Sequence, residues 1–403
     1  MSRTAFTNAK IVCPAGGIRT GTLVIDGDAI AAGEDTTGAT IIDCAGRTLA
    51  PGIVDLGAFA VDKAACRDGG VVRVGLMPDQ SPVLDDPGII RRAATMGKPE
   101  LWVHPLGAAT RGLAGVDLAE MAINASAGAR AVATGRRWIG DSGLMRKALA
   151  YARDCGLTVV SHAEDARLTG DAVATDGLTA TLLGLPAAPA VAEALAIARD
   201  LMLAEDTGAR LHIRQVTTGA GFDLIRAAKR RGVAVTCGIT PAHLMLSDIA
   251  VSDFRSYAHL SPPLRAEADR RACMAALADG TIDVLASGDD PRGPEEKRLP
   301  FADSAPGAAG TRTLLALALG LARDAEIGLD RLFALLAAHP ARVLGLDAGT
   351  LEPGKPADLI LFDEGTPWAI DAEAIGNTPF DGLPVQGRVL RMFKGGKEIP
   401  AKG

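Results

Sequence analysis

Eight short apolar runs, separated by longer stretches of helical character, recur between residues 53 and 285 of this 403-residue chain. Ala/Leu/Arg-rich segments such as 143–155 and 190–205 lie between several of the runs. Buried strands that alternate with helices form parallel β/α units, and eight such units close into a barrel. We therefore predict an α/β fold, a (β/α)8 TIM barrel. Its strands are expected at 53–56, 71–74, 101–103, 130–132, 157–160, 210–213, 232–235 and 282–285.

The two ends of the chain show another pattern, in which short strands are broken by turns. Residues 22–25 run into Asp26-Gly27-Asp28, which is typical of a β-hairpin. After residue 345, further strands are expected at 357–362 and 387–393. The simplest arrangement joins both termini, 1–50 and 346–403, in one small β-domain beside a barrel that spans 51–345.

Composition excludes several classes of function. The net charge is −6 and no long Lys/Arg block occurs, so we expect no nucleic-acid partner. No run of 18 apolar residues occurs, so no membrane span is expected. The six cysteines are scattered without a CxxC pair, and the first residues lack the layout of a signal peptide. These features predict a cytoplasmic protein with reduced thiols.

Five stretches occur in the same order as matching stretches of a known family. They are Ala-Pro-Gly-Ile-Val-Asp at 50–55, Val-Thr-Cys-Gly-Ile-Thr-Pro-Ala-His-Leu at 235–244, Leu-Ser-Pro-Pro-Leu-Arg at 260–265, Asp-Gly-Thr-Ile-Asp-Val at 279–284 and Gly-Lys-Pro-Ala-Asp-Leu at 354–359. Over nearly its whole length the chain resembles the dihydroorotases of the amidohydrolase superfamily. The resemblance implies an amidohydrolase-type barrel and chemistry on a cyclic amide, with zinc activating water and polarising the carbonyl.

The resemblance also implies a ligand set: H-x-H on strand 1, a carboxylate or modified Lys on strand 4, one His each on strands 5 and 6, and an Asp on strand 8 that serves as general base. Strand 1 departs from it first. The H-x-H positions are Gly57 and Phe59, neither of which can ligate zinc. Val61 stands where a substrate-binding Arg is expected. The segment 55–78 is also shorter than in typical members by about three helical turns.

The middle strands keep only part of the set. Strand 4 ends in Arg136 and Arg137 and offers no Asp or Lys. Strand 5 retains His162 in a His-Ala-Glu-Asp run. On strand 6, His212 matches the first of two histidines spaced three apart, and Gln215 stands at the second, which is the expected ligand. His162 and His212 are therefore interpreted as vestiges of a metal site.

Strand 8 departs as well, because Gly288 occupies the position of the Asp. Asp289 follows one place later, and in a strand its side chain would turn to the opposite face. Arg292 replaces the last His of the family motif. Two substrate-contact positions have also changed, since Asp79 and Ser261 stand where Asn is usual.

These departures favour a non-catalytic dihydroorotase-like protein without a cofactor. The resemblance implies that such a chain forms an oligomer with the catalytic chain of aspartate carbamoyltransferase and supports its assembly. We therefore expect a structural role in pyrimidine biosynthesis, although nothing in the residues identifies the partner.

Two other interpretations stay open. An active cyclic amidohydrolase could hold one zinc ion in a rebuilt site made from His162, His212 and Asp289 or Asp290, with His243 more distant. In that case Asp289 or Asp290 would be the catalytic base. Alternatively, the old pocket binds an anion such as orotate. The substrate-binding residues would then be Arg136, Arg137 and Arg292, unless these arginines are only solvated loop residues.

Overall fold

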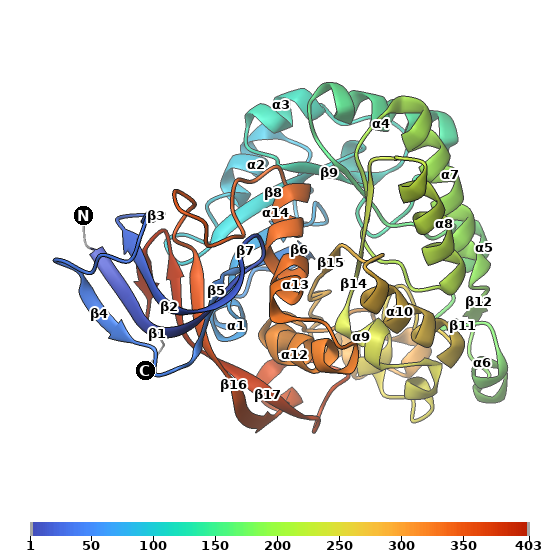
Figure 1. Ribbon diagram of the computed structural model, residues 1–403. Helices are drawn as coiled ribbons and strands as arrows, with labels where there is room; N and C mark the ends of the chain where they lie inside the picture. The colour runs from blue at the N-terminus through green and yellow to red at the C-terminus, as the bar shows by residue number, and fades with distance from the viewer. Residues whose placement is uncertain (1–2, 401–403) are drawn as a thin grey trace.

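The barrel is built of eight parallel strands, as predicted, in a computed structural model that describes residues 3–400 (Figure 1). In chain order they are β6 (Ile53–Ala58), β7 (Val71–Leu76), β8 (Trp102–Ala108), β9 (Ala131–Ala133), β10 (Val159–Ser161), β13 (Leu211–Ile213), β14 (Val235–Ile239) and β15 (Val284–Leu285). The hydrogen-bonded order is β15-β14-β13-β10-β9-β8-β7-β6. The largest shift of a strand start from its predicted position is in β14. The turn after the preceding helix includes Gly232 at φ 83°, so the strand begins three residues later than expected.

Side-chain and loop contacts join the first and last strands of the barrel. The backbone N–H and the hydroxyl of Ser287 donate to the Asp55 carboxylate at 2.9 and 2.6 Å. The backbone N–H of Phe59 donates to the carbonyl of Asp289 at 2.8 Å. Asp55 is buried, and this burial raises its pKa. The carboxylate before the expected H-x-H positions thus holds the barrel together at its seam.

Helices surround the barrel in an outer ring (Figure 1). The longer ones are α1 (Lys63–Gly69), α2 (Pro87–Ala93), α3 (Met121–Ser126), α4 (Ser142–Asp154), α6 (Leu178–Leu183), α7 (Val191–Thr207), α8 (Gly219–Arg230), α10 (Glu267–Asp279) and α12 (Leu314–Asp324). Shorter helical segments are α5 (Ala166–Thr169), α9 (Pro241–Met245), α11 (Pro294–Lys297), α13 (Leu329–Phe333), α14 (His339–Val343) and α15 (Ala372–Ile375). A small sheet of β11 (Ala174–Thr175) and β12 (Ala187–Ala188) lies in the same ring.

Helix α4 illustrates why these segments are helical. Asp141 caps its first turn by accepting a hydrogen bond from the backbone N–H of Leu144 at 2.7 Å. Met145, Leu149 and Ala152 follow at helical spacing and are buried against the barrel. An apolar stripe of this kind fixes which face of a helix packs on a strand.

A second sheet of eight strands contains both ends of the chain, as predicted. Its strands are β1 (Arg3–Cys13), β2 (Gly17–Asp26), β3 (Ala29–Ile30), β4 (Thr40–Asp43), β5 (Thr48–Pro51), β16 (Leu359–Ala369), β17 (Pro384–Lys394) and β18 (Lys397–Ile399). The predicted hairpin is present, because Asp26 pairs with Ala29. The rings of Phe6 and Phe393 pack edge to face in its core, 5.0 Å apart. The two ends of the chain thus build one hydrophobic core.

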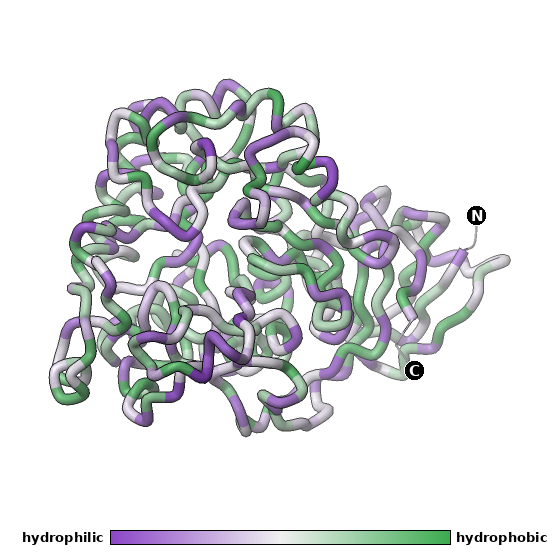
Figure 2. The backbone as a smooth tube through the Cα atoms, turned by 180° about the vertical axis from the view of Figure 1, so that it is seen from behind, coloured by the Kyte–Doolittle hydropathy of each residue, from purple (hydrophilic) through white to green (hydrophobic). Residues whose placement is uncertain are grey.

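Gly52 marks the passage from the terminal sheet into the barrel. It lies between β5 and β6, and a Cβ atom there would come within 2.3 Å of the Val72 side chain. Hydrophobic segments run through both sheets, whereas hydrophilic segments are frequent in the outer loops (Figure 2). Among the described residues, no helix has the length and apolar character needed to cross a membrane.

Candidate functional site

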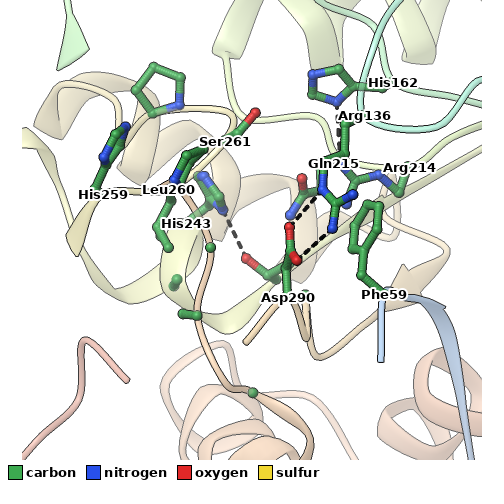
Figure 3. Close-up of a pocket in the computed structure, with 18 of the residues that line it drawn as sticks. Phe59, Arg136, His162, Arg214, Gln215, His243, His259, Leu260, Ser261 and Asp290 are labelled. Atoms are coloured by element: carbon green, nitrogen blue, oxygen red, sulfur yellow. Dashed lines mark hydrogen bonds and ion pairs between the residues drawn. The ribbon is translucent and has the colours of Figure 1, made fainter. Parts of the chain in front are cut away.

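A cavity of about 550 Å³ lies at the carboxyl ends of the barrel strands (Figure 3). Barrel enzymes carry their active sites at this end. Each of six strands sends a lining residue into it from the loop that follows. These residues are Phe59 after β6, Arg136 after β9, His162 after β10, Arg214 after β13, Thr240 after β14 and Asp290 after β15.

Two guanidinium groups pack on the ring of Phe59. The Cζ atom of Arg136 lies 4.0 Å from the ring centroid, and that of Arg214 lies 5.1 Å from it. Gly57 has φ 95°, and a Cβ atom there would lie 3.3 Å from Cδ of Arg214. The two positions that correspond to H-x-H are therefore occupied by an aromatic ring and by a glycine against which an arginine packs.

Arg214 is a buried cation without a carboxylate partner. Its side chain is about 5% exposed, and one Nη atom donates to Nδ1 of His162 at 3.3 Å. Within residues 3–400, no carboxylate oxygen lies within 4.0 Å of its nitrogen atoms, and its Nε–H has no hydrogen-bond partner. Burial lowers the pKa of Arg214 to about 10, so the group stays charged at neutral pH.

Asp290 forms ion pairs with two of the three arginines that were predicted to bind an anion, Arg136 and Arg292. Its carboxylate accepts two hydrogen bonds from Arg136, at 3.0 and 2.7 Å (Figure 3). It accepts a third from Arg292 at 2.9 Å. Asp79 adds a hydrogen bond from the backbone N–H of Arg136 at 3.0 Å. Arg137 lines the cavity but is largely exposed. Arg136 and Arg292 are therefore already neutralised by a side chain of the protein.

The His-Ala-Glu-Asp run contributes two residues to the cavity lining, His162 and Glu164. Nε2 of His162 lies 3.7 Å from Oε2 of Glu164, and Arg265 donates to Oε1 of Glu164 at 3.0 Å. Burial raises the pKa of Glu164, but its hydrogen bond with His162 and the charge of Arg265 outweigh burial and hold the pKa at about 2. Arg265 also lies 3.5 Å from Glu193, which accepts hydrogen bonds from the backbone of Thr217. Glu164 thus lines the cavity and also belongs to a buried ion network with Arg265 and Glu193.

Two of the candidate metal or catalytic residues do not line the cavity. His212 lies within β13, where Nδ1 contacts the Thr236 hydroxyl at 2.8 Å and burial lowers its pKa to about 3. Asp289 accepts hydrogen bonds from the backbone N–H groups of Gly310 and Thr311, at 2.8 and 3.1 Å. Burial raises the pKa of Asp289 to about 6. The rebuilt set of His162, His212 and Asp289 is therefore not brought together.

His243 does line the cavity, but both of its ring nitrogens are engaged. Nδ1 contacts the Thr240 hydroxyl at 2.8 Å, and Nε2 donates to the carbonyl of Pro262 at 3.0 Å. Burial lowers its pKa to about 4, which keeps the ring neutral. This histidine fixes the Ser-Pro-Pro-Leu-Arg loop and has no nitrogen left for a metal ion.

Comparison with known proteins places the chain in a family. The sequence profile of the amidohydrolase family matches residues 115–399. A dihydroorotase of Syntrophotalea carbinolica is 38% identical, with 96% of each chain covered. A dihydroorotase of Citrifermentans bemidjiense is 36% identical, with 94% of this chain and 95% of the relative covered. The chain belongs to the dihydroorotase family.

Solved structures agree with the fold of this dihydroorotase-family chain. An L-hydantoinase (dihydropyrimidinase) from Arthrobacter aurescens superposes with a TM-score of 0.87 at 23% identity, covering 100% of this chain and 97% of that one. A dihydropyrimidinase from Brevibacillus agri gives a TM-score of 0.82 at 20% identity, covering 98% and 94%. Both neighbours therefore share the overall fold of this chain over nearly its whole length.

The donor set of this dihydroorotase-family member does not fit the zinc chemistry that the resemblance implies. A catalytic zinc ion typically takes three protein ligands and a water molecule. Within residues 3–400, no group of three or more His, Cys, Asp or Glu side chains could hold a metal ion. His162 faces the cavity but lies beside the cationic Arg214, which would repel a metal ion. No step of a reaction is therefore derived through zinc.

Arg214, the residue on which the character of the cavity depends, is not among the predicted site residues. Only the neighbouring His212 and Gln215 occupy positions of the family motif. Arg214 is the first residue after β13, at the end of the barrel where active-site side chains lie. Its position directly after a predicted strand could have identified it as a candidate site residue.

Proposed function

We propose that this dihydroorotase-family chain is non-catalytic and acts in pyrimidine biosynthesis as a structural partner of the catalytic chain of aspartate carbamoyltransferase. The observation that supports this most is the packing of Arg136 and Arg214 on Phe59. That packing fills, with an aromatic ring and two cations, the region in which the family's strand-1 ligands are expected.

The groups needed for hydrolysis are also poorly placed. Hydrolysis of a cyclic amide needs an activated water and a polarised carbonyl, together with a base in reach of the water. Gly288 stands at the position of the family's base. Asp290 faces the cavity, but both of its carboxylate oxygens already accept hydrogen bonds from Arg136 and Arg292.

The partner role rests on the resemblance, combined with retention of the scaffold. Both barrel and terminal sheet are complete, and similarity to dihydroorotases extends over 96% of the chain. A chain that keeps its fold while its site residues diverge fits a role carried by shape and surface.

Co-expression with the aspartate carbamoyltransferase catalytic chain of the same organism tests the partner role. We expect the two chains to elute together in size-exclusion chromatography, and the carbamoyltransferase to assemble less completely without its partner. An Arg214→Met variant should elute in the same complex, because its side chain is buried inside the barrel. Separate elution of two wild-type chains at micromolar concentration would contradict the proposal.

A further inference from the structure

Helix α7 is apolar on its outward face as well as on the face that packs on the barrel. The inward face is buried and includes Ile197. The outward face carries an apolar stripe at spacings of four, three and four residues, formed by Val191, Leu195, Ala198 and Met202. Val191, Leu195 and Met202 are 52%, 51% and 69% exposed. A helix that is apolar all round is normally buried on every side, so α7 in the single chain lacks a covering layer on its outward face.

The segments next to α7 extend this apolar surface. Six of the sixteen exposed large apolar side chains within residues 3–400 lie between residues 168 and 202, namely Leu168, Leu178, Leu182, Val191, Leu195 and Met202. Helix α5 contacts the start of α7, because the backbone N–H of Asp165 donates to the carbonyl of Ala192 at 3.2 Å. Helices α5, α6 and α7 lie on the side of the barrel away from the terminal sheet (Figure 1). The six side chains together are called the α5–α7 face.

The α5–α7 face is large enough to form much of a stable interface. A large aliphatic side chain accounts for roughly 100 Å² of apolar surface, so the six partly exposed side chains together present roughly 300–400 Å². A standard interface buries about 800 Å² per partner, of which about 450–500 Å² is apolar. An apolar patch of a few hundred Å² on a soluble chain is typical of a contact with another protein.

We propose that the α5–α7 face binds a second copy of this chain, with the two α7 helices packed antiparallel about a two-fold axis. This dimer goes beyond the proposed partner role and does not depend on it.

The order of side-chain sizes along α7 favours a second copy over an unrelated partner. A two-fold interface places the same patch of both copies in contact, so the patch has to be complementary to itself. With the axis between residues 196 and 197, Leu195 of one copy lies opposite Ala198 of the other, and Val191 lies opposite Met202. A large side chain thus meets a small one on each side of the axis. Spacings of four and three residues are also those of packed helix pairs.

The charges at the two ends of the stripe match in the same arrangement. Arg167, on α5 beside the start of α7, is exposed and forms no ion pair within residues 3–400. The other end of α7 carries Glu205 and Asp206 and has no basic residue in its last turn. Each of these carboxylates pairs with one arginine of a neighbouring helix, Arg231 or Arg146. Antiparallel packing brings Arg167 of one copy towards the carboxylates of the other, where the helix dipole also favours a cation.

Sedimentation velocity of the full-length protein alone tests the dimer. We expect a species of twice the 41.3 kDa of one chain, with Kd below about 10 µM. Leu195→Glu and Met202→Glu each place two charges in the dimer interface, and each should raise Kd at least about 100-fold. Both side chains are exposed in the single chain, so both variants should keep the wild-type circular dichroism spectrum.

Ile123→Glu is the matched control, because Ile123 lies on helix α3 and is 52% exposed. This variant should dimerise like the wild type. A monomeric wild-type protein, or dimers that persist in both Leu195→Glu and Met202→Glu, would overturn the proposal.

Cysteine cross-linking tests the antiparallel arrangement independently of these variants. Residue 191 of one copy lies opposite residue 202 of the other, whereas the two copies of residue 191 lie about 16 Å apart along the helices. Oxidation of an equimolar mixture of Val191→Cys and Met202→Cys chains should therefore give disulfide-linked dimers. Each variant alone should give no more than the wild type, which controls for the native cysteines. Equal cross-linking of either variant alone would contradict the antiparallel pairing.

The dimer and the partner role can fail separately. A dimer of this chain that does not co-elute with the aspartate carbamoyltransferase catalytic chain would support this inference and contradict the partner role. A wild-type monomer whose co-elution with that chain is abolished by Leu195→Glu would assign the α5–α7 face to the carbamoyltransferase. That result would overturn the dimer and support the partner role.

Discussion

The guanidinium of Arg214 lies 3.3 Å from Nδ1 of His162, the strand-5 histidine that the dihydroorotase resemblance assigns to metal. A neutral imidazole that accepts a hydrogen bond from a cation cannot use the same nitrogen for a metal ion. The cation is also locked in place, because its side chain packs beside Gly57 and on the ring of Phe59. The guanidinium of Arg214 thus lies in the region where the chemistry of the family would need a metal ion.

Restoring the H-x-H motif should not restore a zinc site. In a Gly57→His/Phe59→His variant, the first histidine would have to adopt φ 95° and would bring its Cβ within 3.3 Å of Arg214. We expect the double variant to bind less than one zinc ion per chain in elemental analysis after dialysis, and to melt below the wild type. One zinc ion per chain in a folded double variant would show that the Arg214 side chain moves aside readily, and would contradict the prediction.

Asp290 should matter for stability because it neutralises two arginines. Asp290→Asn removes the charge that Arg136 and Arg292 share, while keeping the size of the side chain. We expect the free energy of unfolding in urea to fall by about 1–3 kcal/mol. Asp206→Asn breaks the exposed pair with Arg146 and should cost no more than about 1 kcal/mol. Equal effects of the two substitutions would refute a special role for Asp290.

The buried Arg265 should be among the most sensitive positions of the barrel. Its guanidinium lies between the carboxylates of Glu164 and Glu193, and all three side chains are buried. Arg265→Leu would leave two buried negative charges facing one another, so we expect a loss of about 3–5 kcal/mol in urea unfolding. Arg271→Leu, which removes an exposed arginine paired with Glu267, is the matched control. A small effect at Arg265, comparable with that at Arg271, would argue against the buried network.

Asp289 should make stability depend on pH. Burial raises its pKa to about 6 in the folded protein, so the folded state binds this proton more tightly than the unfolded chain does. The contribution of Asp289 to the free energy of unfolding should therefore decrease as pH rises from about 4 to about 6. Asp289→Asn removes this titration, so its stability relative to wild type should improve by about 2–3 kcal/mol over that window. Parallel curves for the two proteins would disprove the raised pKa.

The fold could be predicted from sequence because its signals are local and repeated. Each of the eight apolar runs is long enough to indicate a strand, and errors of up to five residues at their ends do not change the topology. The start of β14 could not be predicted in this way. Gly232 and the residues after it form a turn, although the apolar pattern alone assigns them to the strand.

Site residues could be predicted only at positions where the family motif specifies which residue to expect. Gly57, Phe59 and Gly288 were recognised as departures because the motif says what should stand there. Arg214 has no counterpart in the motif, and its importance comes from three-dimensional packing against Phe59 and His162. Likewise, nothing in the sequence pairs Asp290 with Arg136, which lies 154 residues away. Side chains on opposite sides of a barrel come together only when the fold closes, so the local sequence does not reveal which of them will pair.

The most direct test of the account is elemental analysis of the untagged protein, combined with a dihydroorotase assay on the same sample supplemented with zinc. If Phe59 and the cations Arg136 and Arg214 have replaced the metal site, the protein holds far less than one metal ion per chain and shows no turnover with added zinc. About one bound metal ion per chain together with zinc-dependent turnover would contradict the account.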